Sequence, residues 1–192
     1  MKPGAAIAAV VTAAGRIAAW AGFLLVLVTV FDVATRNLSQ SGFGAIRDVI
    51  AAEQTWIGST RLQELEWHLH TVLFAFCLGW AYLKGAHVRI GVVRDRLSPR
   101  VQAWIEIAGI VLFLLPFCAL VLHFSLDFVA RSFAQGEGSA TAAGLPHRWI
   151  IKSALPVGFA LLALAGIARL IAVVRDLRSG APAGNGDMPA AG

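Results

Sequence analysis

Residues 61–100 constrain the fold most strongly, because the sequence changes there from polar to apolar to basic over a short distance. The segment opens with acidic and aromatic residues, and residues 71–83 form an uncharged, mostly apolar run. As an α-helix, residues 62–83 extend about 33 Å, enough to cross a hydrocarbon core of about 30 Å. The loop that follows holds five cations: Lys84, Arg89, Arg94, Arg96 and Arg100. Because short basic loops stay in the cytoplasm, this helix is predicted to run from outside to inside.

The composition predicts an integral membrane protein. Hydrophobic residues make up 58% of the 192 residues and charged residues only 14%, and the mean hydropathy is +0.73. A soluble domain of this length cannot cover so much apolar surface with so few charges. The net charge of +5 does not indicate nucleic-acid binding, because the cations lie at the ends of apolar runs and not among stacking aromatic residues.

Four transmembrane helices are predicted, at about residues 16–37, 62–83, 101–131 and 146–175, forming one all-α domain over residues 1–178. Ser98 and Pro99 are typical of a helix start, and Pro116 and Pro156 are expected to kink the third and fourth helices. Residues 39–60 are predicted to form an amphipathic helix in the outer interface, with a disordered connector as the alternative. Residues 179–192, rich in Gly, Pro and Ala, are predicted to be a disordered cytoplasmic tail.

The distribution of cations predicts that both termini of this multi-pass protein lie in the cytoplasm. Ten of the 16 Lys and Arg residues fall on the proposed inner side and six on the outer side. The two cysteines, Cys77 and Cys118, are expected at depths that differ by roughly 16 Å, which is too far for a disulfide.

The polar entrance of the second helix holds the candidate contact residues. Glu64 and Glu66 lie just inside the outer boundary, where an unpaired carboxylate is costly. Arg36 at the end of the first helix and Arg148 or Lys152 at the start of the fourth are expected at the same level. One or both carboxylates are therefore expected to pair with these cations and to set how the helices splay.

Two histidines leave a different function open. His70 and His123 each lie about 8 residues from the outer end of their helices, so antiparallel packing would bring two imidazoles to one haem. This alternative is a four-helix b-type cytochrome or the membrane anchor of a quinone-linked oxidoreductase. Against it, Asp127 lies four residues from His123 and offers a simpler partner. The ELEWHLH segment also holds two Glu–His pairs, but helical geometry separates them and no third metal ligand is near, so no metal site is predicted.

Far from the helix ends, ionisable residues are scarce, and no polar cluster accompanies the two central prolines. A subunit that carried substrate alone would be expected to show broken helices with polar groups near the midplane. The chain is therefore predicted to be a scaffold, and not an enzyme.

Several separated motifs resemble the small membrane subunit, or small permease, of tripartite ATP-independent periplasmic (TRAP) transporters. The resemblance covers residues 17–174. Its motifs are Arg36-Asn37, LQELEWHLH from Leu62, GAHVRI from Gly85, the LSPR before helix three, and GLPHRWIIKSALPVGFALL from Gly144. The last motif and the long connector resemble the mannitol or chloroaromatic branch, whose relatives take up 2-oxo acids. The chain departs from the family at Gly91, near which the family commonly has an acidic residue.

The resemblance implies two protein partners beside membrane lipids. A large membrane subunit would carry an organic acid by an elevator motion coupled to sodium, after a periplasmic binding protein had captured it. The small subunit would widen the static scaffold and form part of the docking floor for the binding protein. No cofactor is implied. The expected scaffold contacts are Arg36, Glu64, Glu66, Arg148 and Lys152, and the expected cytoplasmic anchor is Lys84, His87, Arg89, Arg94, Arg96 and Arg100.

Overall fold

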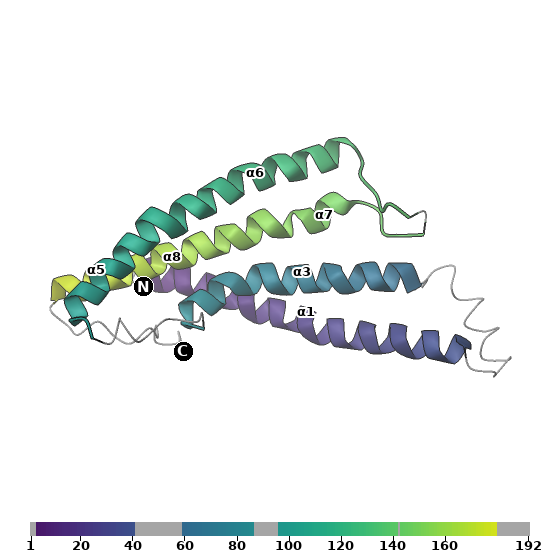
Figure 1. The fold of residues 1–192 in the computed structure, drawn as a ribbon, viewed down its shortest axis with the longest axis horizontal. Helices are drawn as coiled ribbons and strands as arrows, with labels where there is room; N and C mark the ends of the chain where they lie inside the picture. The colour runs from purple at the N-terminus through teal and green to yellow at the C-terminus, as the bar shows by residue number, and fades with distance from the viewer. Residues whose placement is uncertain (1–2, 41–58, 87–95, 142, 180–192) are drawn as a thin grey trace.

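The computed structural model describes residues 3–40, 59–86, 96–141 and 143–179, and within these ranges every regular element is a helix (Figure 1). In chain order the elements are α1 (Pro3–Gln40), α3 (Ser59–Leu83), α5 (Pro99–Gly109), the π-helical turn η1 (Ile110–Leu114), α6 (Leu115–Ala134), α7 (Arg148–Lys152) and α8 (Ala154–Ser179). The all-α class is thus confirmed for the described residues. The predicted amphipathic segment from residue 41 to 58, the centre of the basic loop with His87, Arg89 and Arg94, and the tail from residue 180 lie outside them.

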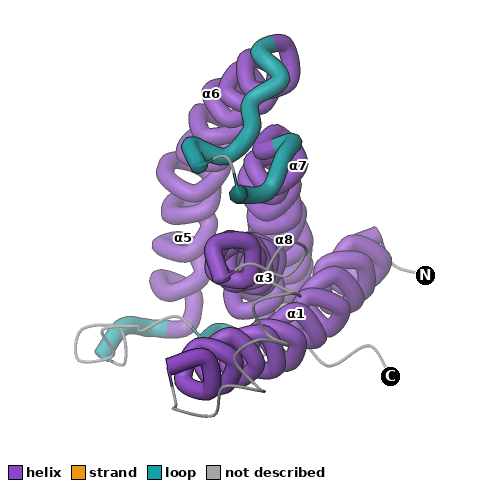
Figure 2. The backbone as a smooth tube through the Cα atoms, turned by 90° about the vertical axis from the view of Figure 1, so that its right-hand side faces the viewer, coloured by secondary structure: helices purple, strands orange, loops and turns teal. Residues whose placement is uncertain are grey.

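Helix α8 lies at the centre of the bundle. It contacts α1, α3, α5 and α6, while α1 packs mainly along α3. Figure 2, which looks along the bundle, shows α8 and α3 between α1 and the α5–α6 segment. The core follows from this arrangement and joins residues of α1, α3 and α8, namely Val11, Leu83, Leu161, Ala165 and Ala168.

Two glycines let α3 and α8 approach closely. A Cβ atom on Gly158 of α8 would lie 2.6 Å from the carbonyl oxygen of Ala75 on α3. A Cβ atom on Gly79 of α3 would lie 2.8 Å from the carbonyl oxygen of Leu161 on α8. Backbone-to-backbone packing through small residues is typical of membrane helices, since apolar lipid supplies no hydrophobic force between them.

Three helical segments are long and apolar enough to cross a membrane: Gly4–Leu38, Pro99–Ala134 and Arg148–Ser179. Only 11% of the most apolar window of each of the first two is buried, against 44% for the third, which agrees with the central place of α8. Helix α3 is not among them, because the charged and polar residues of its first half reduce its hydropathy. A fourth span and the location of the termini therefore stay predictions.

The first helix begins at Pro3, and the prediction of a start near residue 16 is wrong. The added turns are rich in Ala, the strongest helix former, and Pro3 stands in the first helical position, where its missing amide hydrogen is harmless. These turns also pack against the rest of the bundle, because Val11 is fully buried beside Leu83 and Leu161. Tertiary packing thus stabilises a part of the helix that the sequence reading had left outside it.

Each of the two central prolines lies next to an irregular turn. Pro116 has no amide hydrogen, and its ring crowds the carbonyl of the preceding turn. The π-helical turn η1 precedes it, and there the Leu115 amide donates to the carbonyl of Ile110, five residues earlier. Pro156 follows the non-helical residue Ser153, which separates α7 from α8.

Candidate functional site

Glu64 on α3 joins the second helix to the segment between α6 and α7. Its carboxylate accepts a hydrogen bond from the Ser139 hydroxyl at 2.5 Å and one from the Leu145 backbone amide at 2.6 Å. A guanidinium nitrogen of Arg148, the first residue of α7, lies 3.3 Å from the same carboxylate. Glu64 is only 8% exposed, so its charge depends on these donors in place of water.

Residues 135–147 are here called the outer loop, and their described parts, 135–141 and 143–147, lie against Glu64. The Ser139 amide donates to the carbonyl of Leu145 at 3.1 Å, which joins the two described parts of the loop. A Cβ atom on Gly144 would lie 2.1 Å from the Ser139 hydroxyl and 2.7 Å from a carboxylate oxygen of Glu64, so a side chain there would displace the contact. His147 takes a left-handed conformation, with φ 59°, and turns the chain into α7.

Two further contacts, an ion pair and a hydrogen bond, hold the outer loop in place. Lys152 forms an ion pair with Glu137 and lies 4.0 Å from the centre of the Phe128 ring. The hydrogen bond from Lys152 is the main reason why the pKa of the Glu137 carboxyl is below its usual value. The guanidinium of Arg61 donates to the carbonyl of Ala143 at 3.0 Å. The loop is thus tied to α3 on one side and to α7 on the other.

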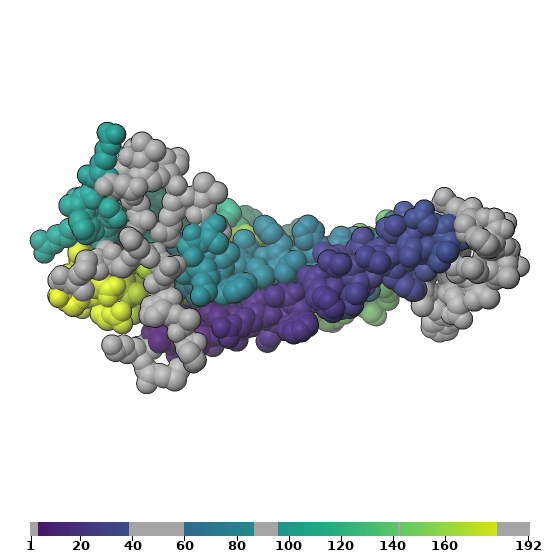
Figure 3. Space-filling view, turned by 90° about the horizontal axis from the view of Figure 1, so that it is seen from below, coloured from purple at the N-terminus to yellow at the C-terminus, as the bar shows by residue number. Residues whose placement is uncertain are grey.

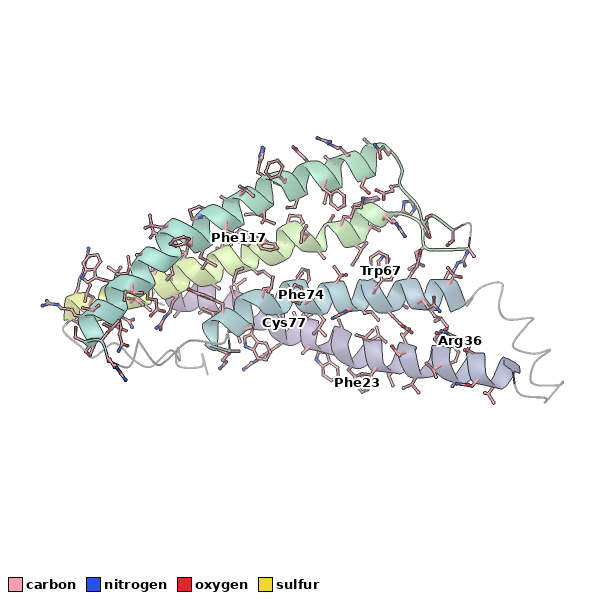
Figure 4. All side chains as sticks on the ribbon, in the orientation of Figure 1. Phe23, Arg36, Trp67, Phe74, Cys77 and Phe117 are labelled. Atoms are coloured by element: carbon pink, nitrogen blue, oxygen red, sulfur yellow. The ribbon has the colours of Figure 1, made fainter. Side chains whose placement is uncertain are left out.

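The predicted contact residues do not all meet. Arg148 lies against Glu64, and its guanidinium stands 5.7 Å from the ring centre of Trp67, which lies on the side of α3 toward α7 (Figure 4). Arg36 pairs with the buried Asp32, four residues earlier on α1, a spacing that places two side chains on the same face of a helix.

The other two predicted contacts have different surroundings. Lys152 pairs with Glu137, not with a carboxylate of α3. One carboxylate oxygen of Glu66 is buried and has no hydrogen-bond partner in the described part of the chain. Of the five residues, the structure therefore brings only Glu64 and Arg148 into contact with each other.

A further ion pair, which was not predicted from the sequence, lies at the other end of the bundle. Arg169 of α8 is 8% exposed and binds Glu106 of α5 through two nitrogens, at 2.6 Å and 3.1 Å. Arg169 is one of the ten cations that the sequence assigns to the inner side, and neither it nor Glu106 had a predicted partner. The position of Arg169 within an apolar helix could have indicated such a pair, because an ionisable residue inside an apolar helix usually faces a partner within the bundle.

The residues of the haem alternative lie on helices that do not pack together. His70 belongs to α3 and His123 to α6, both are exposed, and α8 contacts both helices. The described residues hold no group of three or more His, Cys, Asp or Glu side chains that could bind a metal ion. Cys77 and Cys118 are free thiols, as predicted from their different depths.

The described members of the cytoplasmic anchor lie far from Glu64. Lys84 follows the end of α3, and Arg96 and Arg100 lie before and in the first turn of α5, at the end of the bundle opposite the outer loop (Figure 1). All three side chains are exposed. These exposed cations thus lie at the opposite end of the bundle from Glu64.

The family model described as "Tripartite ATP-independent periplasmic transporters, DctQ component" matches residues 25–176. The match covers most of the chain and includes the residues of the Glu64–Arg148 and Glu106–Arg169 ion pairs. No curated protein and no solved structure matches the chain.

Proposed function

Because the chain belongs to the family of DctQ components of tripartite ATP-independent periplasmic transporters, we propose that it forms a static scaffold for a large subunit that imports an organic acid with sodium. Family membership makes the chain the small subunit of such a transporter, a membrane component that acts with a large subunit and a periplasmic binding protein. The family match is the observation that carries the proposal. The substrate class, the sodium coupling and the elevator motion of the large subunit are parts of the proposal.

The pairing of charges supports a scaffold and not a conduit. Glu64–Arg148 and Glu106–Arg169 are largely buried carboxylate–guanidinium contacts, and each joins two different segments of the chain. A buried charge that already has a partner stabilises the fold and is not free to bind a passing anion. We therefore assign transport itself to the large subunit.

We propose that α3 is the fourth span and that the protein is a multi-pass component of a bacterial inner membrane, with both termini in the cytoplasm. Composition alone does not identify α3 as a membrane span, because its first turns hold Arg61, Glu64 and Glu66. The outer loop supplies donors to Glu64, and α3 packs between α1 and α8, so much of its polar first half is covered by protein. This cover reduces the cost of placing α3 across the membrane.

The outer loop would give this subunit a fixed outer surface. Its links to Glu64 and Lys152 prevent the outer ends of α3 and α7 from moving apart. We propose that this surface, with α1 and α6 beside it, is presented to the large subunit and to the periplasmic binding protein. As the substrate we propose a 2-oxo acid, or another organic acid that transporters of the mannitol or chloroaromatic branch take up.

The direct experiment is co-purification of this chain with the large subunit, combined with uptake of labelled organic acids in cells that also make the binding protein. The two membrane subunits should purify together, and removal of this chain should abolish uptake. Replacement of sodium by choline should stop uptake as well. Parental uptake without this chain would refute the scaffold role, whereas sodium-independent uptake would overturn only the proposed coupling.

A further inference from the structure

A groove of about 610 Å³ lies at the end of the bundle where α8 ends. It is lined by Leu170, Ile171, Val174, Arg175, Arg178 and Ser179. The first turn of α1 borders it, since a Cβ atom on Gly4 would lie 3.4 Å from the side chain of Ile171. Figure 3 shows the end of α8, in yellow, next to the start of α1, in purple. The groove therefore has one apolar wall, and Arg175 and Arg178 lie at the end of that wall.

The groove lies at the level where lipid headgroups begin. The segment Arg148–Ser179 has 32 residues and extends about 48 Å, which exceeds the hydrocarbon core of about 30 Å. Counted from Lys152 at the outer loop, about 20 helical residues cross that core, and the count ends near Ile171. The apolar wall then faces acyl chains, while Arg175 and Arg178 stand among the phosphates.

The charge of the groove selects an anion. Arg175 donates to the carboxylate of its neighbour Asp176 at 3.1 Å and 3.3 Å, so about half of its guanidinium is already engaged. Arg178 is exposed and makes no ion pair in the described part of the chain. Asp176 cancels only one of the two positive charges. A guanidinium binds a phosphate through two parallel hydrogen bonds, and this geometry suits a phosphodiester headgroup.

We propose that this groove binds one anionic phospholipid, with an acyl chain along Leu170, Ile171 and Val174 and the phosphate at Arg175 and Arg178. The bound lipid would join the start of α1 to the end of α8. The inference concerns a lipid site of the small subunit itself. The proposed lipid site does not depend on which compound the transporter carries.

The headgroup part is tested with the full chain in detergent, by native mass spectrometry with phosphatidylglycerol or phosphatidylcholine at equal concentration. The parent should retain phosphatidylglycerol about tenfold more than phosphatidylcholine, and Arg175→Gln with Arg178→Gln should abolish this preference. Arg131→Gln is the matched control, because Arg131 is also exposed on a helix but lies at the other end of the bundle. Equal retention of both lipids by the parent, or an equal loss in the control, would overturn the proposal.

The acyl part is tested by narrowing the groove. Val174→Phe should reduce retention of phosphatidylglycerol severalfold, with helix content and thermal midpoint checked to confirm that the variant folds. Inorganic phosphate at millimolar concentration should not displace the lipid, because it lacks the apolar part. If phosphate alone displaces the lipid, the natural occupant of the groove is a free anion. If a chain that ends at Ser179 binds several times more lipid than the parent, the natural occupant is the chain's own tail. Either result would show that the proposal is wrong.

Discussion

Glu64 differs from Glu66 although both are carboxylates in the first half of α3. Glu64 accepts hydrogen bonds from Ser139 and Leu145 and faces Arg148, whereas one buried oxygen of Glu66 has no partner among the described residues. The same chemical change at these two positions should therefore have different effects, because the partners, and not the residue type, determine the energy.

We expect Glu64→Gln to lower the free energy of unfolding by about 2 kcal/mol, because it weakens the charge-assisted bonds and leaves Arg148 without its counter-ion. Glu66→Gln is the matched control and should change stability by less than about 0.5 kcal/mol. Both are measured by unfolding the purified chain in mixed detergent micelles with increasing dodecyl sulfate. Equal losses in the two variants would contradict this role of Glu64.

Glu137 provides a pH-dependent part of the outer loop. Its pKa is lowered chiefly by the hydrogen bond from Lys152, so the folded state favours the ionised form more than the unfolded state does. The resulting stabilisation is present above the usual carboxylate range and is lost as the pH falls through the lowered pKa. The thermal midpoint of the parent should exceed that of Glu137→Gln at pH 6, and this difference should shrink progressively as the pH falls below about 4. A difference that stays constant over this range would exclude the ion pair as its cause.

At the scale of the elements, the pair between α5 and α8 is the contact whose loss should cost most. Arg169 and Glu106 are both largely buried, and removal of one partner leaves a charge without compensation. Arg169→Met should lower the free energy of unfolding by about 3 to 5 kcal/mol, and Glu106→Leu added to it should recover part of the loss. Arg175→Gln, which breaks an exposed pair, should cost at most about 1 kcal/mol. A double variant that is less stable than Arg169→Met would argue against an uncompensated charge.

The contact between α3 and α8 can be tested with a single methyl group. In Gly158→Ala the new Cβ would lie 2.6 Å from a backbone oxygen of α3, so the two helices must separate and the thermal midpoint should fall by several degrees. Gly109→Ala adds the same atom where nothing lies within 4 Å, and should be stabilising by up to about 1 kcal/mol through helix propensity. Thermal unfolding in detergent compares the two. A loss of similar size in both would mean that the close approach is unimportant.

At the scale of the whole molecule, α1 and α6 bury little of their apolar surface within the chain. Trp20 is 72% exposed on α1, and Phe113 of η1, just before α6, is 74% exposed. Side chains such as Phe23 also point away from the bundle (Figure 4). Such surfaces require lipid or another apolar partner, in agreement with a membrane component of a multi-subunit transporter.

Topology is the prediction that belongs to this scale. With four spans and cytoplasmic termini, a single cysteine at Gly138 in the outer loop should react with a membrane-impermeant maleimide in intact cells. A cysteine at Lys84 or Arg100 should react only after the membrane is opened. Both native thiols, Cys77 and Cys118, are first replaced by Ala. Labelling of Lys84→Cys from outside would reverse the orientation derived from charge.

The amino-acid sequence by itself determined the helical class, the free state of both cysteines and the small-subunit family, which the family match confirms. These properties are local, since hydropathy, helix propensity and short motifs act over a few turns.

Only the tertiary structure decided which charges meet. Sequence arithmetic placed Arg36, Arg148 and Lys152 at the depth of Glu64, but depth along a helix does not specify the direction in which a side chain points. Arg36 is held by Asp32 of its own helix, and the partners of Glu64 lie 75 to 84 residues further along the chain. The pair of Arg169 with Glu106, 63 residues away, arises in the same way, because it depends on the packing of α8 against α5.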